Sequence, residues 1–290
     1  MSFVRLTRPA GWIAGLVLLG CSVLASPAQA QAVAVVTNVK GLVHLAPGNK
    51  SVSLLSELAP GADVTLEPGA LLSFVYLQSG TEFQLSGPAR ATVGAAAPQS
   101  VSGASAVPRS SVVAAETVKL QTTNGRVVLG GMVMRGPGLE RLKLIEPTGK
   151  VLSARPGFAW SMPAEVAVAQ FELREEGSDK ILLSTPVPGS QLVLADGVAL
   201  QPGVNYLWTV SIDVPGANSL ARSSYFSLPG AQERERIEAL RPGPQAPFSD
   251  RLIFASLLEQ GRFLSESRKL WQQLAQERPD LPELRNLANK

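Results

Sequence analysis

The sequence has few of the side chains on which most enzyme chemistry depends. Its 290 residues include one cysteine, Cys21, and one histidine, His44. Zinc sites usually combine several cysteines or histidines, and a serine nucleophile needs a histidine base beside it. His44 lies in the middle of a predicted strand and has no nucleophile motif near it. We therefore predict that the protein is not an enzyme and holds no metal ion or cofactor.

Long apolar runs are also scarce, and the one at the N-terminus has the form of an export signal. Arg5 and Arg8 precede an apolar stretch over residues 12–19, and residues 28–30 are Ala-Gln-Ala. Signal peptidase cleaves after this small-residue pattern. No later run approaches the roughly 18 apolar residues that a membrane helix needs. We predict that residues 1–30 are a bacterial signal peptide, and that the mature chain is periplasmic or secreted and does not span a membrane.

The single cysteine makes a lipid anchor the alternative. Residues 18–21, Leu-Leu-Gly-Cys, resemble a bacterial lipobox, in which Cys21 carries the lipid and becomes the first residue of the mature chain. The residue before Gly20 is leucine, where alanine or serine is more usual, and apolar residues continue past Cys21. Removal of Cys21 with the signal peptide is therefore the favoured prediction.

Charge is scarce as well, and it is balanced. Charged residues make up 17% of the chain, with 26 Lys and Arg against 23 Asp and Glu. The predicted signal peptide contains two of the arginines, which leaves 24 basic and 23 acidic residues. The basic residues are scattered and form no dense patch with interleaved aromatics, as nucleic-acid-binding surfaces do. We therefore exclude nucleic acid as a partner.

Short apolar segments separated by glycine and proline turns fill residues 31–137, which is the pattern of an all-β domain. The apolar run over residues 71–77 is rich in aromatic and β-branched side chains and predicts a buried strand. Residues 95–111 are rich in Ala, Ser, Pro and Gly and predict a flexible loop. An Asn-Gly pair at 124–125 predicts a hairpin. The pattern leaves open whether this hairpin bridges to the next domain, and we assign it to the first.

The spacing of the turns and apolar residues in this first domain resembles a FecR-like periplasmic domain over roughly 65 residues. The resemblance implies a role in periplasmic sensing or in the cell envelope. The best-known member of that family is a sigma-factor regulator that spans the membrane. Its cytoplasmic segment and inner-membrane helix have no counterpart here, so transmembrane signalling is not implied. The usual Asp-Gly-Ser turn is replaced by residues 78–81, Gln-Ser-Gly-Thr. The matching residues are Val36, Gly41, Val43, Leu58, Gly61, Val64, Leu72, Phe74, Gly80, Thr81, Phe83 and Leu85.

Residues 138–229 contain seven short strand patterns at the spacing of a β-sandwich. Pro202 and Gly203 mark a tight turn, and Tyr206 and Trp208 then alternate with smaller residues along a strand. This stretch resembles the turn into a central strand of a fibronectin type III sandwich. The resemblance implies that the Tyr206 hydroxyl bonds to upstream backbone and that Trp160 is buried. Stacking of these aromatic rings on sugars is the less favoured alternative to core packing.

Residues 230–290 predict helices over 232–240, 249–260, 265–277 and 281–288, with Ser249 and Asp250 as a helix cap. The pattern of Gly261, Phe263, Ser267, Trp271 and Pro279 resembles one tetratricopeptide hairpin, with one extra residue in its usual spacing. A single repeat has no neighbours on which to stack. We expect this hairpin to dock on the sandwich, to dock on another chain, or to form a small satellite.

Together these patterns predict a mainly β protein with two all-β modules and a small C-terminal helical hairpin. Its predicted function is that of an exported, non-enzymatic binding or scaffold protein of the cell envelope. The expected partner is another envelope protein, since sandwiches and tetratricopeptide hairpins imply protein contacts. The alternative is a periplasmic protein that binds carbohydrate or peptidoglycan.

Overall fold

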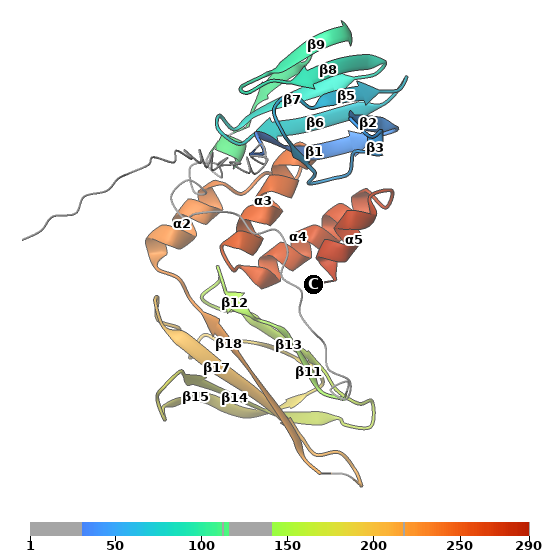
Figure 1. The fold of residues 1–290 in the computed structure, drawn as a ribbon. Coiled ribbons are helices and arrows are strands. Elements are labelled where there is room, and N and C mark those ends of the chain that lie inside the picture. Colours follow the sequence, from blue (N-terminus) through green and yellow to red (C-terminus); the bar gives the residue numbers. More distant parts are fainter. Residues whose placement is uncertain (1–30, 112, 116–140, 217, 290) are drawn as a thin grey trace, which may run out of the picture. The chain divides into compact units, whose positions relative to one another are not determined.

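The computed structural model describes residues 31–111, 113–115, 141–216 and 218–289 (Figure 1). The predicted signal peptide with Cys21 and the predicted hairpin at 124–125 lie outside these residues. The predicted fold class is confirmed, because the described chain is mainly β, with several antiparallel sheets followed by short C-terminal helices.

The first β region consists of two five-stranded sheets in which all neighbouring strands are antiparallel. Apolar residues of both sheets belong to one buried cluster, so the two sheets pack face to face. The strands of the first sheet, in spatial order, are β10 (Val107–Ser110), β7 (Thr81–Ser86), β6 (Leu71–Tyr76), β1 (Ala34–Lys40) and β4 (Glu57–Leu58), and those of the second are β3 (Lys50–Ser51), β2 (Val43–Ala46), β5 (Asp63–Leu66), β8 (Ala89–Val93) and β9 (Pro98–Gly103).

Strand β6 is buried on both of its faces. Five consecutive residues from Leu72 to Tyr76 are buried, although successive side chains of a strand point to opposite sides. One face packs on the second sheet, and the other is covered by C-terminal helices. This double covering explains why the sequence of β6 is a continuous apolar run and not an alternating one.

The prediction of a flexible loop over residues 95–111 is wrong, because β9 and β10 lie there. Strand β9 pairs with β8, and β10 pairs with β7 so that Arg109 lies opposite Glu82. The side chains of β9 are small, polar and almost all exposed. Composition therefore gives no sign of this strand, whose pairing depends on backbone hydrogen bonds.

Residues 141–216 and 218–228 form the predicted fibronectin type III-like sandwich, with one sheet of three strands and one of five. Strand β12 runs parallel to β18, and all other neighbouring strands are antiparallel. The smaller sheet contains, in order, β11 (Lys143–Glu146), β13 (Gly157–Ser161) and β16 (Gln191–Val193), and the larger one contains β12 (Gly149–Lys150), β18 (Leu220–Ser227), β17 (Asn205–Ile212), β14 (Val168–Glu175) and β15 (Ile181–Pro188).

Aromatic rings fill the space between these two sheets. Phe158 of the smaller sheet contacts Phe171 and Trp208 of the larger one edge to face, with ring centroids 4.8 and 5.3 Å apart. Such contacts add to the free energy gained by burying the rings. The apolar residues of the sandwich form a cluster separate from that of the first β region.

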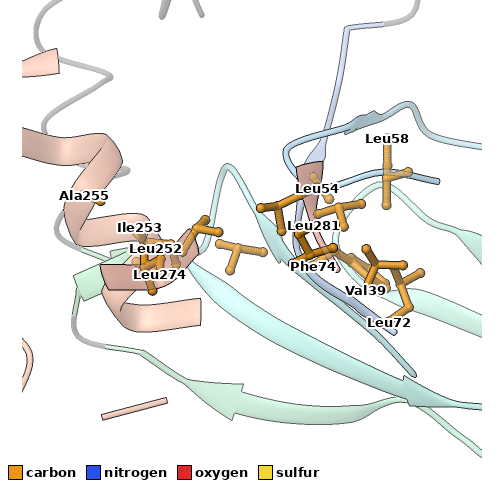
Figure 2. Packing of buried hydrophobic residues seen from close by; sticks show 14 of the residues in the cluster. Val39, Leu54, Leu58, Leu72, Phe74, Leu252, Ile253, Ala255, Leu274 and Leu281 are labelled. Carbon is orange, nitrogen blue, oxygen red and sulfur yellow. The ribbon is translucent and has the colours of Figure 1, made fainter. Parts of the chain in front are cut away.

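The four C-terminal helices begin and end within about two residues of the predicted limits. Their buried side chains belong to the same cluster as the first two sheets. Figure 2 shows residues of this cluster, with Leu252 and Leu274 of the helices in one group and Phe74 and other strand residues in another. The helices therefore dock on the first β region, an arrangement that the sequence analysis did not consider. They are α2 (Ala231–Ala239), α3 (Phe248–Gln260), α4 (Leu264–Glu277) and α5 (Pro282–Ala288).

Candidate functional site

A buried charged cluster joins α3 to the first sheet. Arg109 of β10 donates a hydrogen bond through Nε to Glu82 Oε2 of β7 at 2.5 Å. Its Nη2 donates to Asp250 Oδ1 of α3 at 2.7 Å. Glu82 is 3% exposed, so its charge depends on this guanidinium for compensation.

Hydroxyl groups donate further hydrogen bonds to the two carboxylates of this cluster. Thr37 Oγ1 donates to Glu82 Oε1 at 2.8 Å, Ser249 Oγ donates to Glu82 Oε2 at 3.2 Å, and Ser111 Oγ donates to Asp250 Oδ1 at 2.8 Å. The hydrogen bond to Asp250 and the nearby charge of Glu82 raise the pKa of Arg109 above its ordinary value. Both carboxylates of the cluster thus share the Arg109 guanidinium and accept from hydroxyl groups, which favours a structural role over a catalytic one.

The predicted cap at Ser249 and Asp250 is wrong. The residue before α3 is Pro247, which makes no side-chain capping bond, and Ser249 and Asp250 lie inside the first turn of the helix. Their side chains bond to Arg109 and Glu82 instead. Ser and Asp at a helix start predict a cap only when no distant partner competes for their oxygens.

The aromatic residues named from the sequence lie in protein cores. Trp160, Tyr206 and Trp208 are 2%, 0% and 0% exposed. The backbone nitrogen of Gln201 donates to the Tyr206 hydroxyl at 2.6 Å, and this hydroxyl donates to the Gln201 carbonyl at 3.3 Å. Burial raises the pKa of Tyr206. These rings are not accessible to a sugar in the folded chain.

The other residues singled out from the sequence have structural surroundings as well. Gly203 has a φ of +81° and follows Pro202 in the turn before β17, where a side chain would be strained. Trp271 Nε1 donates to Glu259 Oε2 of α3 at 3.1 Å. His44 is half-buried in the middle of β2. Within the described ranges, no group of three or more His, Cys, Asp or Glu side chains is placed to hold a metal ion.

The larger sandwich sheet, unlike the buried residues above, exposes apolar and aromatic side chains to solvent. We call the side of β15, β14, β17 and β18 that points away from the core the outer sheet face. Arg174 lies opposite Leu207, and Leu207 opposite Tyr225, so the three form one row across the strands. Val168, Ile181 and Tyr225 are 50%, 53% and 54% exposed on this face. Three large apolar or aromatic side chains are therefore available to a partner.

A cleft of about 220 Å³ lies at one end of the outer sheet face. Arg174, Glu175, Leu207 and Tyr225 line it from the strands, and the turn over residues 176–179 lines its remaining side. No sequence pattern selects this cleft. The alternation along β17 places Leu207 outward once Tyr206 is inward, but pairing with β18 is needed to bring Tyr225 beside it.

Comparisons with known proteins do not show a family for this chain. No family model matches the chain, and no curated protein matches it. Similar solved structures include the fn3 domain of the human collagen alpha-1(XX) chain, which is 14% identical and has a TM-score of 0.25. That match covers 41% of this chain and 96% of the collagen domain. The fold of the sandwich is therefore assigned from its own strand order. In the part of the chain that the structure describes, no helix has the length and apolar character to cross a membrane.

Proposed function

We propose that this chain is an exported, non-enzymatic binding or scaffold protein of the bacterial cell envelope, and that it acts through contacts with another envelope protein. The observation that carries the proposal is the contrast between buried and exposed groups. Buried aromatic and charged residues are held in cores and paired clusters, whereas the outer sheet face exposes Val168, Ile181 and Tyr225. Exposed apolar side chains on one face favour protein contacts.

The cellular location of the protein is part of the same proposal. The pattern of residues 1–30 supports export to the periplasm or the outside of the cell. Retention of a lipid on Cys21 is the alternative, and labelling with a palmitate analogue distinguishes the two. A cell-envelope role is also in keeping with the FecR-like pattern of residues 31–137. Gly41 and Gly61 of that pattern have positive φ angles of 73° and 83°, as turn glycines need.

The tetratricopeptide-like pattern supports the proposal only in part. Gly261, Phe263 and Trp271 lie where α3 meets α4, as in a helical hairpin. The apolar side of this hairpin is already covered by the first β region. We therefore place the partner on the sandwich and not on the helices.

Site-specific photocrosslinking in the native envelope tests the proposed function. A photoreactive amino acid replaces Tyr225 on the outer sheet face, and a control replaces Val193, which is 72% exposed on β16 of the opposite sheet. We expect a discrete crosslinked protein from position 225 and none from position 193. Equal crosslinking at both positions, or at neither, contradicts the proposal, and so does saturable turnover of a substrate by the purified chain.

Carbohydrate or peptidoglycan binding is the alternative function, and the exposed ring of Tyr225 is the observation that favours it. Purified cell-wall sacculi provide the test. Retention of the chain on sacculi that is lost with Tyr225→Ala, together with no protein crosslink at position 225, replaces the first proposal by the second.

A further inference from the structure

We propose that the cleft beside Tyr225 binds a cationic side chain, lysine or arginine, of a partner polypeptide. The proposal rests on the proposed function, since it names the chemistry of the segment that the outer sheet face holds. Three features of the cleft support it: its size, the side chains of its walls and the charges at its rim.

The size of the cleft favours a single side chain over a whole small molecule. Its volume is about 220 Å³, whereas sites for small molecules usually measure roughly 300–1,000 Å³. The cleft also opens onto a sheet face whose neighbouring rows are exposed. A polypeptide that lies along this face can therefore insert one side chain and leave its backbone outside.

The walls of the cleft fit a long aliphatic chain that ends in a positive charge. Leu207 and Tyr225 lie side by side on β17 and β18 and supply an apolar surface. Lysine and arginine place their methylene groups on such surfaces while the charged end stays near water. A cation close to the face of the Tyr225 ring is also attracted by the electrons of that ring.

The charges at the rim select a cation over an anion. Arg174 is paired with Glu172 at 2.6 Å, and Lys180 is paired with Glu175 at 3.3 Å. Glu176 and Asp179 line the same cleft and have no ion pair among the described residues. Arg174 and Lys180 thus each have a carboxylate partner, although the buried Nε of Arg174 makes no hydrogen bond, and the carboxylates of Glu176 and Asp179 remain for a partner. An anionic segment would meet these carboxylates without a free cation to offset them.

Fluorine NMR of the full exported chain provides a direct test, because one of its tyrosines is exposed and the other two are buried. The sequence contains three tyrosines, Tyr76, Tyr206 and Tyr225. The first two are 1% and 0% exposed, and Tyr225 is 54% exposed. After labelling with 3-fluorotyrosine, the probe is the peptide acetyl-Gly-Lys-Gly-amide, with the arginine peptide in parallel. The norleucine peptide, which has a similar stem without the charge, is the control.

We expect the lysine and arginine peptides to shift the Tyr225 resonance saturably and to leave those of Tyr76 and Tyr206 unchanged. The norleucine peptide should shift it much less. The double variant Glu176→Gln with Asp179→Asn should weaken binding by about fivefold, the size expected for exposed charge contacts. Glu165→Gln with Asp196→Asn makes the same change of charge at exposed positions that do not line the cleft, and should leave binding unchanged.

Three results overturn the inference: no saturable shift of Tyr225, equal shifts with lysine and norleucine, or equal weakening by the two double variants. A shift caused by chitotetraose but not by the cationic peptides assigns the cleft to sugar instead. The crosslinking experiment at position 225 reports separately on the proposed function. A discrete crosslink without lysine or arginine binding rejects the cleft chemistry and leaves the protein partner in place.

Discussion

Strands β6 and β14 lie in two five-stranded sheets and both pair with antiparallel neighbours, but they are covered differently. Strand β6 has buried residues on both faces, because a second sheet lies on one side and helices lie on the other. Strand β14 alternates, with Ala169, Phe171 and Leu173 buried and their neighbours exposed or half-buried. A strand that is covered on both faces has no free surface to offer. The comparison therefore leaves the outer sheet face, and not β6, as a free surface, and it is there that we propose binding.

The two cores also differ in the kinds of contact that stabilise them. Aromatic contacts such as Phe158 with Trp208 dominate the sandwich, whereas the first β region and the helices share both an apolar cluster and the charged cluster around Arg109. If the two cores are separate, a change in one should leave the other in place. Residues 31–290 contain three tryptophans, Trp160 and Trp208 in the sandwich and Trp271 in α4. Labelling with 5-fluorotryptophan therefore follows the unfolding of both parts in one sample.

The largest effect is expected from Leu274→Ala. Leu274 lies in α4 and is fully buried in the cluster that the helices share with the first sheets. Removing a buried leucine side chain typically costs about 4 kcal/mol of unfolding free energy when the cavity does not collapse. In urea titrations we expect the midpoint for Trp271 to fall strongly and those for Trp160 and Trp208 to change little. Equal shifts of all three would show that the cores unfold as one unit.

Arg109→Ala should have the next largest effect. It leaves the carboxylates of Glu82 and Asp250 without their cation, and Glu82 remains buried. Loss of one partner of a buried pair costs about 3 to 5 kcal/mol, and we expect about 3 because a third of the Arg109 side chain is exposed. The measurement is again the urea midpoint of Trp271.

Arg90→Ala is the matched control for that variant. Arg90 pairs with Asp63 at 2.8 Å, but the Arg90 side chain is 51% exposed, so the expected loss is below about 1 kcal/mol. A loss for Arg109→Ala as small as that for Arg90→Ala would mean that the buried cluster does not hold α3 on the first sheet.

Whether a feature of the fold or of the site was predictable from the sequence depends on how far apart in the chain its residues lie. The turn at Gly203, the alternation of Tyr206 and Trp208 and the helix limits are local patterns, and the structure places the corresponding elements there. The bonds of Arg109 to Glu82 and Asp250 join residues that are 27 and 141 positions apart. No local pattern selects one partner at such a separation, and Arg109 lay in a segment whose composition predicted a loop. The cleft beside Tyr225 was missed for the same reason, since it depends on the pairing of β17 with β18.

Tyr206→Phe should have a smaller effect, confined to the sandwich. The variant keeps the buried ring and removes the hydroxyl that bonds to both the nitrogen and the carbonyl of Gln201. We expect a loss of about 1 kcal/mol, seen in the midpoint of Trp208 and not in that of Trp271. Tyr225→Phe removes an exposed hydroxyl and should leave both midpoints unchanged. An unchanged Trp208 midpoint for Tyr206→Phe would mean that the hydrogen bonds between Tyr206 and Gln201 do not stabilise the sandwich.

A comparably small effect is a loss of helix stability in acid. Hydrogen bonds from Arg241, Arg251 and Arg278 lower the pKa values of Glu238, Glu277 and Asp280, respectively. Because the folded values lie below the unfolded ones, this stabilisation is complete above about pH 4.5 and is lost as the pH falls through the folded values.

These carboxylates are about half exposed, so screening should limit the combined loss to about 1 kcal/mol. The measurement is the midpoint of Trp271 between pH 6 and pH 3, with Arg251→Gln as the comparison. That variant removes the partner of Glu277 and should flatten the pH dependence. A midpoint that rises on acidification, or an identical pH dependence in Arg251→Gln, would show that these ion pairs do not stabilise the helices.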